Sequence, residues 1–250
     1  MTEVDAQPAR DTDARGTLGT VRNAVLLLQL LSEGPAHQQL TELAERSGLS
    51  LPTVHRLLRS LTVAGLAEQD PRSARYGLGP ELVRLSQRYL ARLPVLSALS
   101  PYLLAVRDAL GVSVCVALYV RGSVAYVDRA DSSDAGPYRE PHRVAPALRT
   151  AAGRLLAAHA DDAGWEAMLS LADEAARAHA IAERANWRSA AYLALADADH
   201  GGMEVSVPVL DGYGRPAAAL AATVGAEQVE HAAGHLARAA QAASRTLGHG

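Results

Sequence analysis

The stretch LSLPTVHRLLRSLTVAG, residues 49–65, decides the first half of the fold. Its apolar residues recur at the spacing of an amphipathic helix: Leu51, Val54, Leu57, Leu58 and Leu61. Ser50 is a favourable residue type for capping this helix, and Pro52 fits its first turn. The opposite face carries basic and hydrogen-bonding side chains: Thr53, His55, Arg56 and Arg59.

Two helices are predicted before this one. The first runs over residues 20–32, with Thr20 as its expected cap. The second runs over residues 39–47 and is followed by Gly48, a residue suited to a tight turn after a helix. Two helices joined by a short glycine-containing turn, the second basic on its outer face, predict a helix-turn-helix.

A small hairpin is predicted directly after the third helix. In LAEQDPRSARYGLG, residues 66–79, two short runs flank DPRS, which has the proline position of a turn. This hairpin would make the helix-turn-helix a winged one. Arg72 lies near its tip, with Arg75 and Tyr76 on the returning strand.

The distribution of charge supports double-stranded DNA as the partner. The whole chain has a net charge of −3, but residues 50–92 hold 7 arginines against 3 acidic residues. An α-helix fits the major groove of DNA, and arginines on a wing can contact phosphate. The expected DNA-binding residues are Ser50, Thr53, His55, Arg56, Arg59, Arg72, Arg75 and Tyr76. The alternatives are a helical core with solvated arginines and a winged helix that contacts protein.

The second half mixes strands with helices. β-rich runs at 112–120 and 123–130 predict one hairpin, and those at 203–210 and 215–224 predict another. Helices are expected at about 95–110, 149–159 and 226–246, with one or two more reaching residue 185. This order indicates an antiparallel sheet with flanking helices, so that the whole chain is α+β with two domains.

The domain boundaries follow from these elements. We expect a disordered tail at 1–17, a winged helix-turn-helix at 18–79, a linker helix at 80–94 and an effector-binding domain at 95–250. The single cysteine cannot form an internal disulfide, and the longest apolar run, AVLLL, is too short to span a membrane. We therefore expect a cytoplasmic protein with no membrane partner.

Several segments resemble the IclR family of bacterial transcription regulators. LTELAERSGLSLPTVHRLLRSLTVAGLAEQDPRSARYGLGPELVRL is similar to the DNA-binding half of that family. VAYVDRAD, PALRTAAGRLLAA and VPVLDGYGRPAAALAATV are similar to segments of its effector half, so that the resemblance covers about residues 18–248. It implies a winged helix-turn-helix, a linker helix used in dimerisation, and a GAF-like domain that binds a small molecule.

The resemblance also implies where an effector would bind. In the family the ligand lies between a curved sheet and loops that include the segment matching Leu148 to Gly153; Thr150 fits that motif, whereas Leu148 and Arg149 depart from it. Family members that bind small carboxylates often have a cysteine at the position that Glu204 occupies here. The resemblance therefore does not extend to a small-acid effector. Arg149 is a candidate partner for an anion, and Glu204 for a cation or hydroxyl.

For Arg149 and Glu204, the alternative is an ordinary charge on the protein surface. For Cys115, Tyr126 and Met203, the alternative is a place in the hydrophobic core. The expected effector-binding residues are Cys115, Tyr126, Leu148, Arg149, Thr150, Ala151, Ala152, Met203, Glu204 and Thr223. No cofactor and no metal are expected.

We therefore predict a homodimeric or homotetrameric regulator, of repressor type, whose binding to a roughly palindromic operator responds to a small-molecule effector. One alternative is a degenerate regulator controlled by a protein partner. A less favoured alternative is a small metal-dependent hydrolase, because His231 and His235 stand four residues apart on the last helix. No glutamate lies between them as in H-E-x-x-H, and no nucleophile elbow or phosphate-binding loop is present, so that an enzyme is not expected.

Overall fold

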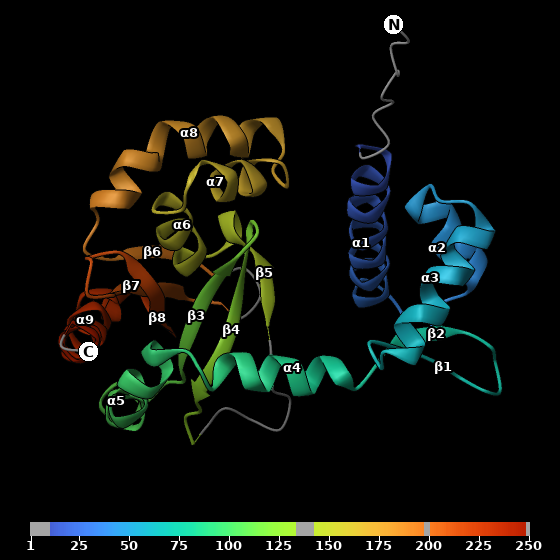
Figure 1. Cartoon of the computed structure of the whole chain (residues 1–250). Coiled ribbons are helices and arrows are strands. Elements are labelled where there is room, and N and C mark those ends of the chain that lie inside the picture. The colour runs from blue at the N-terminus through green and yellow to red at the C-terminus, as the bar shows by residue number, and fades with distance from the viewer. Residues whose placement is uncertain (1–10, 134–142, 198–200, 249–250) are drawn as a thin grey trace, which may run out of the picture. The chain divides into compact units, whose positions relative to one another are not determined.

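The structure is a computed structural model that describes residues 11–133, 143–197 and 201–248 (Figure 1). It divides into two compact units, Met1–Tyr89 and Leu90–Gly250. The division falls within the segment that the sequence predicts as a linker helix.

The first unit begins with three helices, α1 (Asp11–Ser32), α2 (Leu40–Ser47) and α3 (Leu51–Val63). The two later helices match the predicted ones closely. α1, however, begins at Asp11 and not at Thr20, so residues 11–17 are helical where a disordered tail was expected. That segment contains no proline, and its backbone can therefore extend the helix. The expected tail at residues 1–10 lies outside the described residues.

The apolar faces of these helices form the core of the unit. The stripe that the sequence showed on α3 is buried: Val54, Leu57, Leu58 and Leu61. Gln38 is buried as well; its amide donates to the carbonyl of Leu30 at 2.9 Å and accepts from Arg46 at 2.7 Å. Because both polar ends of Gln38 are bonded, this side chain ties the end of α1 to α2 without an unsatisfied group.

The wing is a two-stranded antiparallel hairpin of β1 (Ala67–Gln69) and β2 (Tyr76–Leu78). Gly79 follows it at a close approach between chain segments. A Cβ atom at this position would lie 2.2 Å from the carbonyl oxygen of Gly65, so that only glycine fits. Gly79 thereby lets the end of the wing pack against the turn that follows α3.

α4 (Glu81–Leu90) follows the wing and has no buried residue. Among the described residues, no single helix is long and apolar enough to cross a membrane. The bent pair of α4 and α5 (Pro94–Leu110) meets those two criteria only when both helices are counted together.

The second unit is built on one antiparallel sheet of six strands, in the order β5-β4-β3-β8-β7-β6. The predicted hairpins are β3–β4 and β7–β8, and the sheet confirms the expected fold class. The strands are β3 (Val114–Val120), β4 (Ser123–Ala130), β5 (Val144–Pro146), β6 (Leu193–Ala196), β7 (Met203–Leu210) and β8 (Pro216–Val224). The two short edge strands, β5 and β6, were not predicted.

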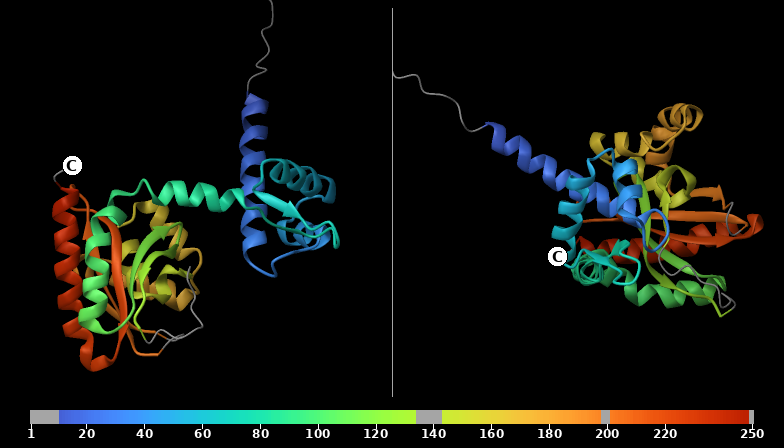
Figure 2. Two further views of the ribbon diagram at one scale, coloured as in Figure 1. Left: turned by 90° about the horizontal axis from the view of Figure 1, so that it is seen from below. Right: turned by 90° about the vertical axis from the view of Figure 1, so that its right-hand side faces the viewer.

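Helices cover both faces of this sheet (Figures 1 and 2). α5 and α9 (Val229–Leu247) pack side by side on one face and share its apolar core. α6 (Ala151–Ala158) packs on the other face against β7 and β8, with α7 (Asp162–Leu169) and α8 (Glu174–Ser189) beside it. The α6 face of the sheet is the one that holds the candidate effector residues.

Candidate DNA-binding surface and effector cavity

The outer face of α3 is open to solvent within its own unit. His55, Arg56 and Arg59 are exposed, whereas Val54 and Leu58 on the opposite face are fully buried. This division follows from the helical period, which places residues three to four apart on the same side. A row of two guanidinium groups and an imidazole is therefore presented along one side of the helix.

The first turn of α3 is organised differently from the expectation. Ser50 has the extended backbone of an N-cap, but its hydroxyl makes no capping bond to the helix backbone. The hydroxyls of Ser50 and Thr53 instead lie 2.8 Å apart and share a hydrogen bond. Both side chains lie at the amino end of the helix, where free N–H groups favour an anion such as phosphate.

The tip of the wing is held by one carboxylate. Asp70 accepts hydrogen bonds from the backbone N–H groups of Arg72 at 3.2 Å and Ser73 at 3.1 Å. The hydroxyl of Ser73 and these two bonds lower the pKa of Asp70 below its ordinary value. Because the turn is fixed in this way, the exposed Arg72 and the half-buried Arg75 extend from an ordered loop.

Tyr76 corrects one of the expected DNA contacts. Its side chain is 5 % exposed and packs in the core of the first unit. Its backbone pairs with Gln38, by an N–H bond at 2.9 Å and a carbonyl bond at 2.8 Å. The alternation of a strand therefore turns the ring inward, and we remove Tyr76 from the DNA-binding set.

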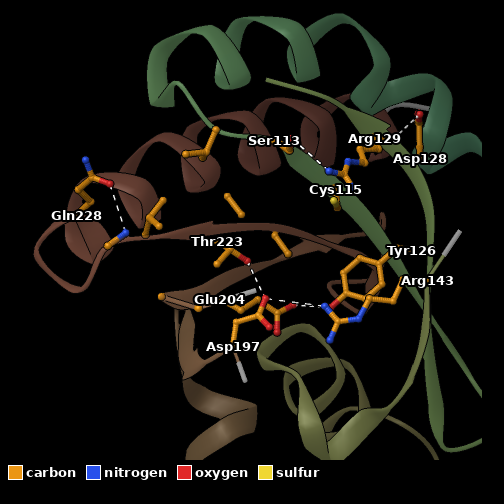
Figure 3. A pocket seen from close by; sticks show the side chains of 17 residues that line it. Ser113, Cys115, Tyr126, Asp128, Arg129, Arg143, Asp197, Glu204, Thr223 and Gln228 are labelled. Carbon is orange, nitrogen blue, oxygen red and sulfur yellow. Dashed lines mark hydrogen bonds and ion pairs between the residues drawn. The ribbon is translucent and has the colours of Figure 1, made fainter. Parts of the chain in front are cut away.

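The second unit contains a cavity of about 540 Å³ on the α6 face of the sheet (Figure 3). Its floor is made by small residues on the two central strands: Cys115 on β3 faces Ala221 on β8, and Thr223 is two residues farther along. Small side chains in the middle of a curved sheet leave space that larger ones would fill. The volume lies within the range of small-molecule sites.

Glu204 is one of two buried acids that line this cavity. It lies on β7 and is 6 % exposed. One carboxylate oxygen accepts from the Tyr126 hydroxyl at 2.5 Å, and the other accepts from the backbone N–H of Ala151 at 2.7 Å. Burial raises the pKa of Glu204, and these two hydrogen bonds oppose that rise.

Asp197 lies beside Glu204 in the cavity wall. It follows β6, and its side chain is 4 % exposed. Its carboxylate accepts from the Thr223 hydroxyl at 3.1 Å and lies 3.9 Å from the guanidinium of Arg143. That guanidinium also stacks 5.7 Å from the centre of the Tyr126 ring. The two carboxylates and Arg143 thus form one charged cluster (Figure 3).

The opposite rim of the cavity has a separate ion pair. Arg129 is paired with Asp131, and its guanidinium donates to the Ser113 hydroxyl at 3.4 Å. Cys115 lies below this rim, and burial raises the pKa of its thiol to about 11. The thiol is therefore protonated at neutral pH and acts as an apolar wall rather than as a nucleophile.

The structure separates the expected effector residues into two groups. Four of them line the cavity: Cys115, Tyr126, Glu204 and Thr223. The other six do not line it: Leu148, Arg149, Thr150, Ala151, Ala152 and Met203.

The six residues outside the cavity lining have other positions. Thr150 caps α6 by accepting from the N–H of Gly153 at 2.9 Å, and Ala152 is core. Leu148 packs against the helices α7 and α8 through a second core cluster, and Arg149 is exposed. The backbone N–H of Ala151 donates to the Glu204 carboxylate, and the half-buried Met203 begins β7, where it pairs with Ala196 and Val224.

Sequence reasoning missed several cavity residues, notably Asp128, Arg129, Arg143, Asp197 and Gln228. Strand alternation gave no signal for Asp128, because a β-bulge in β4 pairs Tyr126 with Ala117 and Asp128 with Val116 and so breaks the two-residue period between them. Arg143 and Asp197 lie next to short strands that the sequence did not reveal. No group of three or more possible metal ligands occurs within the described ranges.

Comparisons with known proteins agree with the helix-turn-helix of the first unit. The IclR helix-turn-helix domain model matches residues 20–71, which include α2 and α3. The glycerol operon regulatory protein of Streptomyces griseus is 41 % identical over 71 residues, and the match spans 28 % of each chain. The HTH-type transcriptional regulator XynR of Escherichia coli is 25 % identical over 245 residues, covering 92 % of this chain and 97 % of the relative.

Solved structures show the same two-domain fold. The IclR transcriptional regulator from Alicyclobacillus acidocaldarius superposes with a TM-score of 0.71 at 25 % identity, over 91 % of this chain and 98 % of that one. The proteins that this chain resembles along its whole length are thus transcriptional regulators and not enzymes.

Proposed function

We propose that this chain, a member of the IclR family, is a transcriptional regulator that binds operator DNA through α3 and the wing. The observation that carries the proposal is the exposed row His55, Arg56 and Arg59 on a helix whose other face is buried. An α-helix of this kind enters the major groove, where arginine reads guanine and its neighbours contact phosphate. In this proposal Thr53 contacts DNA at the amino end of the helix, and Ser50 contacts a phosphate. Arg72 and Arg75 on the wing contact the adjacent sugar-phosphate backbone.

The active form in this proposal is a homodimer or homotetramer that binds a roughly palindromic operator. α4 supports this part, because the large apolar residues Val83, Leu85 and Tyr89 are exposed on it. Exposed apolar side chains gathered on one helix are typical of association surfaces. We propose a cytoplasmic location as well, because operator DNA is the proposed partner.

The second unit is proposed to bind a small-molecule effector in the cavity between Tyr126, Asp197 and Glu204. A concave space of about 540 Å³ with a few convergent polar groups supports a metabolite over a protein partner. We propose a repressor, whose affinity for the operator changes because the effector binds the two conformations unequally.

Selection of bound genomic fragments by the purified chain, followed by gel shifts on the selected duplex, tests DNA binding. The expected result is a specific complex whose affinity falls steeply with salt. Binding that does not distinguish the selected duplex from a scrambled one would contradict the proposal.

A further inference from the structure

Among the residues that the structure describes, more acidic than basic side chains line the cavity of the second unit. The charged residues that line it are Asp128, Asp197, Glu204, Arg129 and Arg143. Arg129 is already ion-paired with Asp131 at the rim. Arg143 lies 3.9 Å from Asp197, and among the described lining residues it is the cation beside the two buried carboxylates of Asp197 and Glu204.

The register of the sheet explains why these two carboxylates are close. Glu204 on β7 faces Leu195 on β6 and Thr223 on β8. Asp197, two residues beyond Leu195, is then the diagonal neighbour of Glu204 on the same face of the sheet. The Asp197 carboxylate accepts from Thr223, the residue opposite Glu204, so both acids converge on one end of the cavity (Figure 3).

Glu204 also occupies the position that best suits an anion. The first N–H groups of a helix favour negative charge, and α6 begins at Ala151 beside the cavity. The Ala151 N–H already donates to the Glu204 carboxylate at 2.7 Å. A carboxylate brought by a ligand would meet a negative charge of the chain itself at this point.

The Glu204 carboxylate retains acceptor capacity. An ionised carboxylate offers about four lone-pair positions. Within the part of the chain that the structure describes, two donors bond it, the Tyr126 hydroxyl and the Ala151 N–H. The remaining positions suit a ligand with several N–H donors.

We propose that this cavity selects small molecules that carry a protonated amine and excludes small carboxylates, with Glu204 as the residue that sets this preference. The ammonium group would lie between Glu204 and Asp197 and offset the excess negative charge there. The apolar part of the ligand would lie against Cys115 and Ala221 on the floor of the cavity. The inference rests on the proposed function, because it names the ligand class of the effector cavity.

The test compares three matched pairs of ring compounds, each as amine and as carboxylate. The pairs are benzylamine and benzoate, phenethylamine and phenylacetate, and cyclohexylmethylamine and cyclohexanecarboxylate. Binding to the full chain without DNA is measured by titration calorimetry at neutral pH. We expect at least one amine to bind about tenfold more tightly than its carboxylate, and Glu204→Gln to remove this difference.

Glu174→Gln is the matched control. It makes the same change of charge at an exposed position on α8, outside the cavity, and should leave the amine preference intact. If Glu204→Gln does not fold, Asp197→Asn serves in its place and should also weaken amine binding about tenfold.

Three results would overturn the inference: carboxylates that bind as tightly as the amines, amine binding that neither cavity variant changes, or no binding by any amine. Gel shifts on the same samples separate this inference from the proposed function. A chain that prefers carboxylates and still binds its operator overturns only the ligand class. A chain that prefers amines but binds no duplex overturns only the proposed regulator.

Discussion

The hydroxyl of Tyr126 donates to the carboxylate of Glu204 at 2.5 Å, although 78 residues separate them in the sequence. Tyr126 is on β4 and Glu204 on β7, with β3 and β8 between them in the sheet. Neighbouring strands lie about 4.8 Å apart, so two strands three positions apart in a flat sheet would be about 14 Å apart. The bond therefore depends on the curvature of the sheet and on the small residues at its centre, which also leave the cavity open.

The stability of the second unit should depend on pH through Glu204. Burial raises the folded-state pKa of Glu204 above its ordinary value of 4.5, so the folded chain holds this proton more tightly than the unfolded chain. The contribution of Glu204 to the free energy of unfolding is then greatest below pH 4.5 and falls as the pH rises through the folded-state pKa. Glu204→Gln has no such proton. Urea unfolding across this pH range should show wild type losing stability relative to the variant; a relative gain would mean that the hydrogen bonds outweigh burial.

Arg56→Ala should weaken operator binding. Arg56 is exposed on the outer face of α3, and a guanidinium that reads a base contributes about 1–3 kcal/mol of discrimination. Gel shifts on the selected operator and on variants of it measure the loss, which should relax one base position. Arg22→Ala, at an exposed position on α1, is the control; an Arg56→Ala chain with unchanged affinity would contradict the placement of α3 in the groove.

Arg72→Ala together with Arg75→Ala should weaken specific and non-specific duplexes alike. Both arginines lie on the wing, where phosphate is the expected contact, and each lost phosphate contact lowers the slope of log affinity against log salt by roughly 0.9. Fluorescence anisotropy over a series of salt concentrations measures the slope. An unaltered slope would show that the wing does not touch phosphate.

Leu58→Ala should lower the free energy of unfolding of the first unit. Leu58 is fully buried in its core, and truncation of a buried leucine costs about 2–5 kcal/mol. Val63→Ala, on the same helix but 85 % exposed, should change the free energy of unfolding very little. Thermal unfolding of both variants distinguishes a core residue from a surface one, and equal losses would contradict the orientation of α3.

The local elements of this protein were predictable because each one is set by neighbours in the sequence. The helical period of residues 51–61 showed which side of α3 is buried, and β-rich runs around short turns showed the hairpins β3–β4 and β7–β8. β6 was missed because Leu193–Ala196 is a short run of residues without strong β preference, and its pairing with β7 decides its conformation.

The sequence by itself therefore determined that a basic helix follows a turn and that a sheet-forming half follows it. The tertiary structure decided which side chains meet. It turned Tyr76 into the core and Arg149 to the surface, and it joined Asp197, Glu204 and Tyr126 in one cavity. Helix and strand periods depend on residues a few positions apart, whereas a cavity depends on strand order and sheet curvature, which are set by pairing between distant segments.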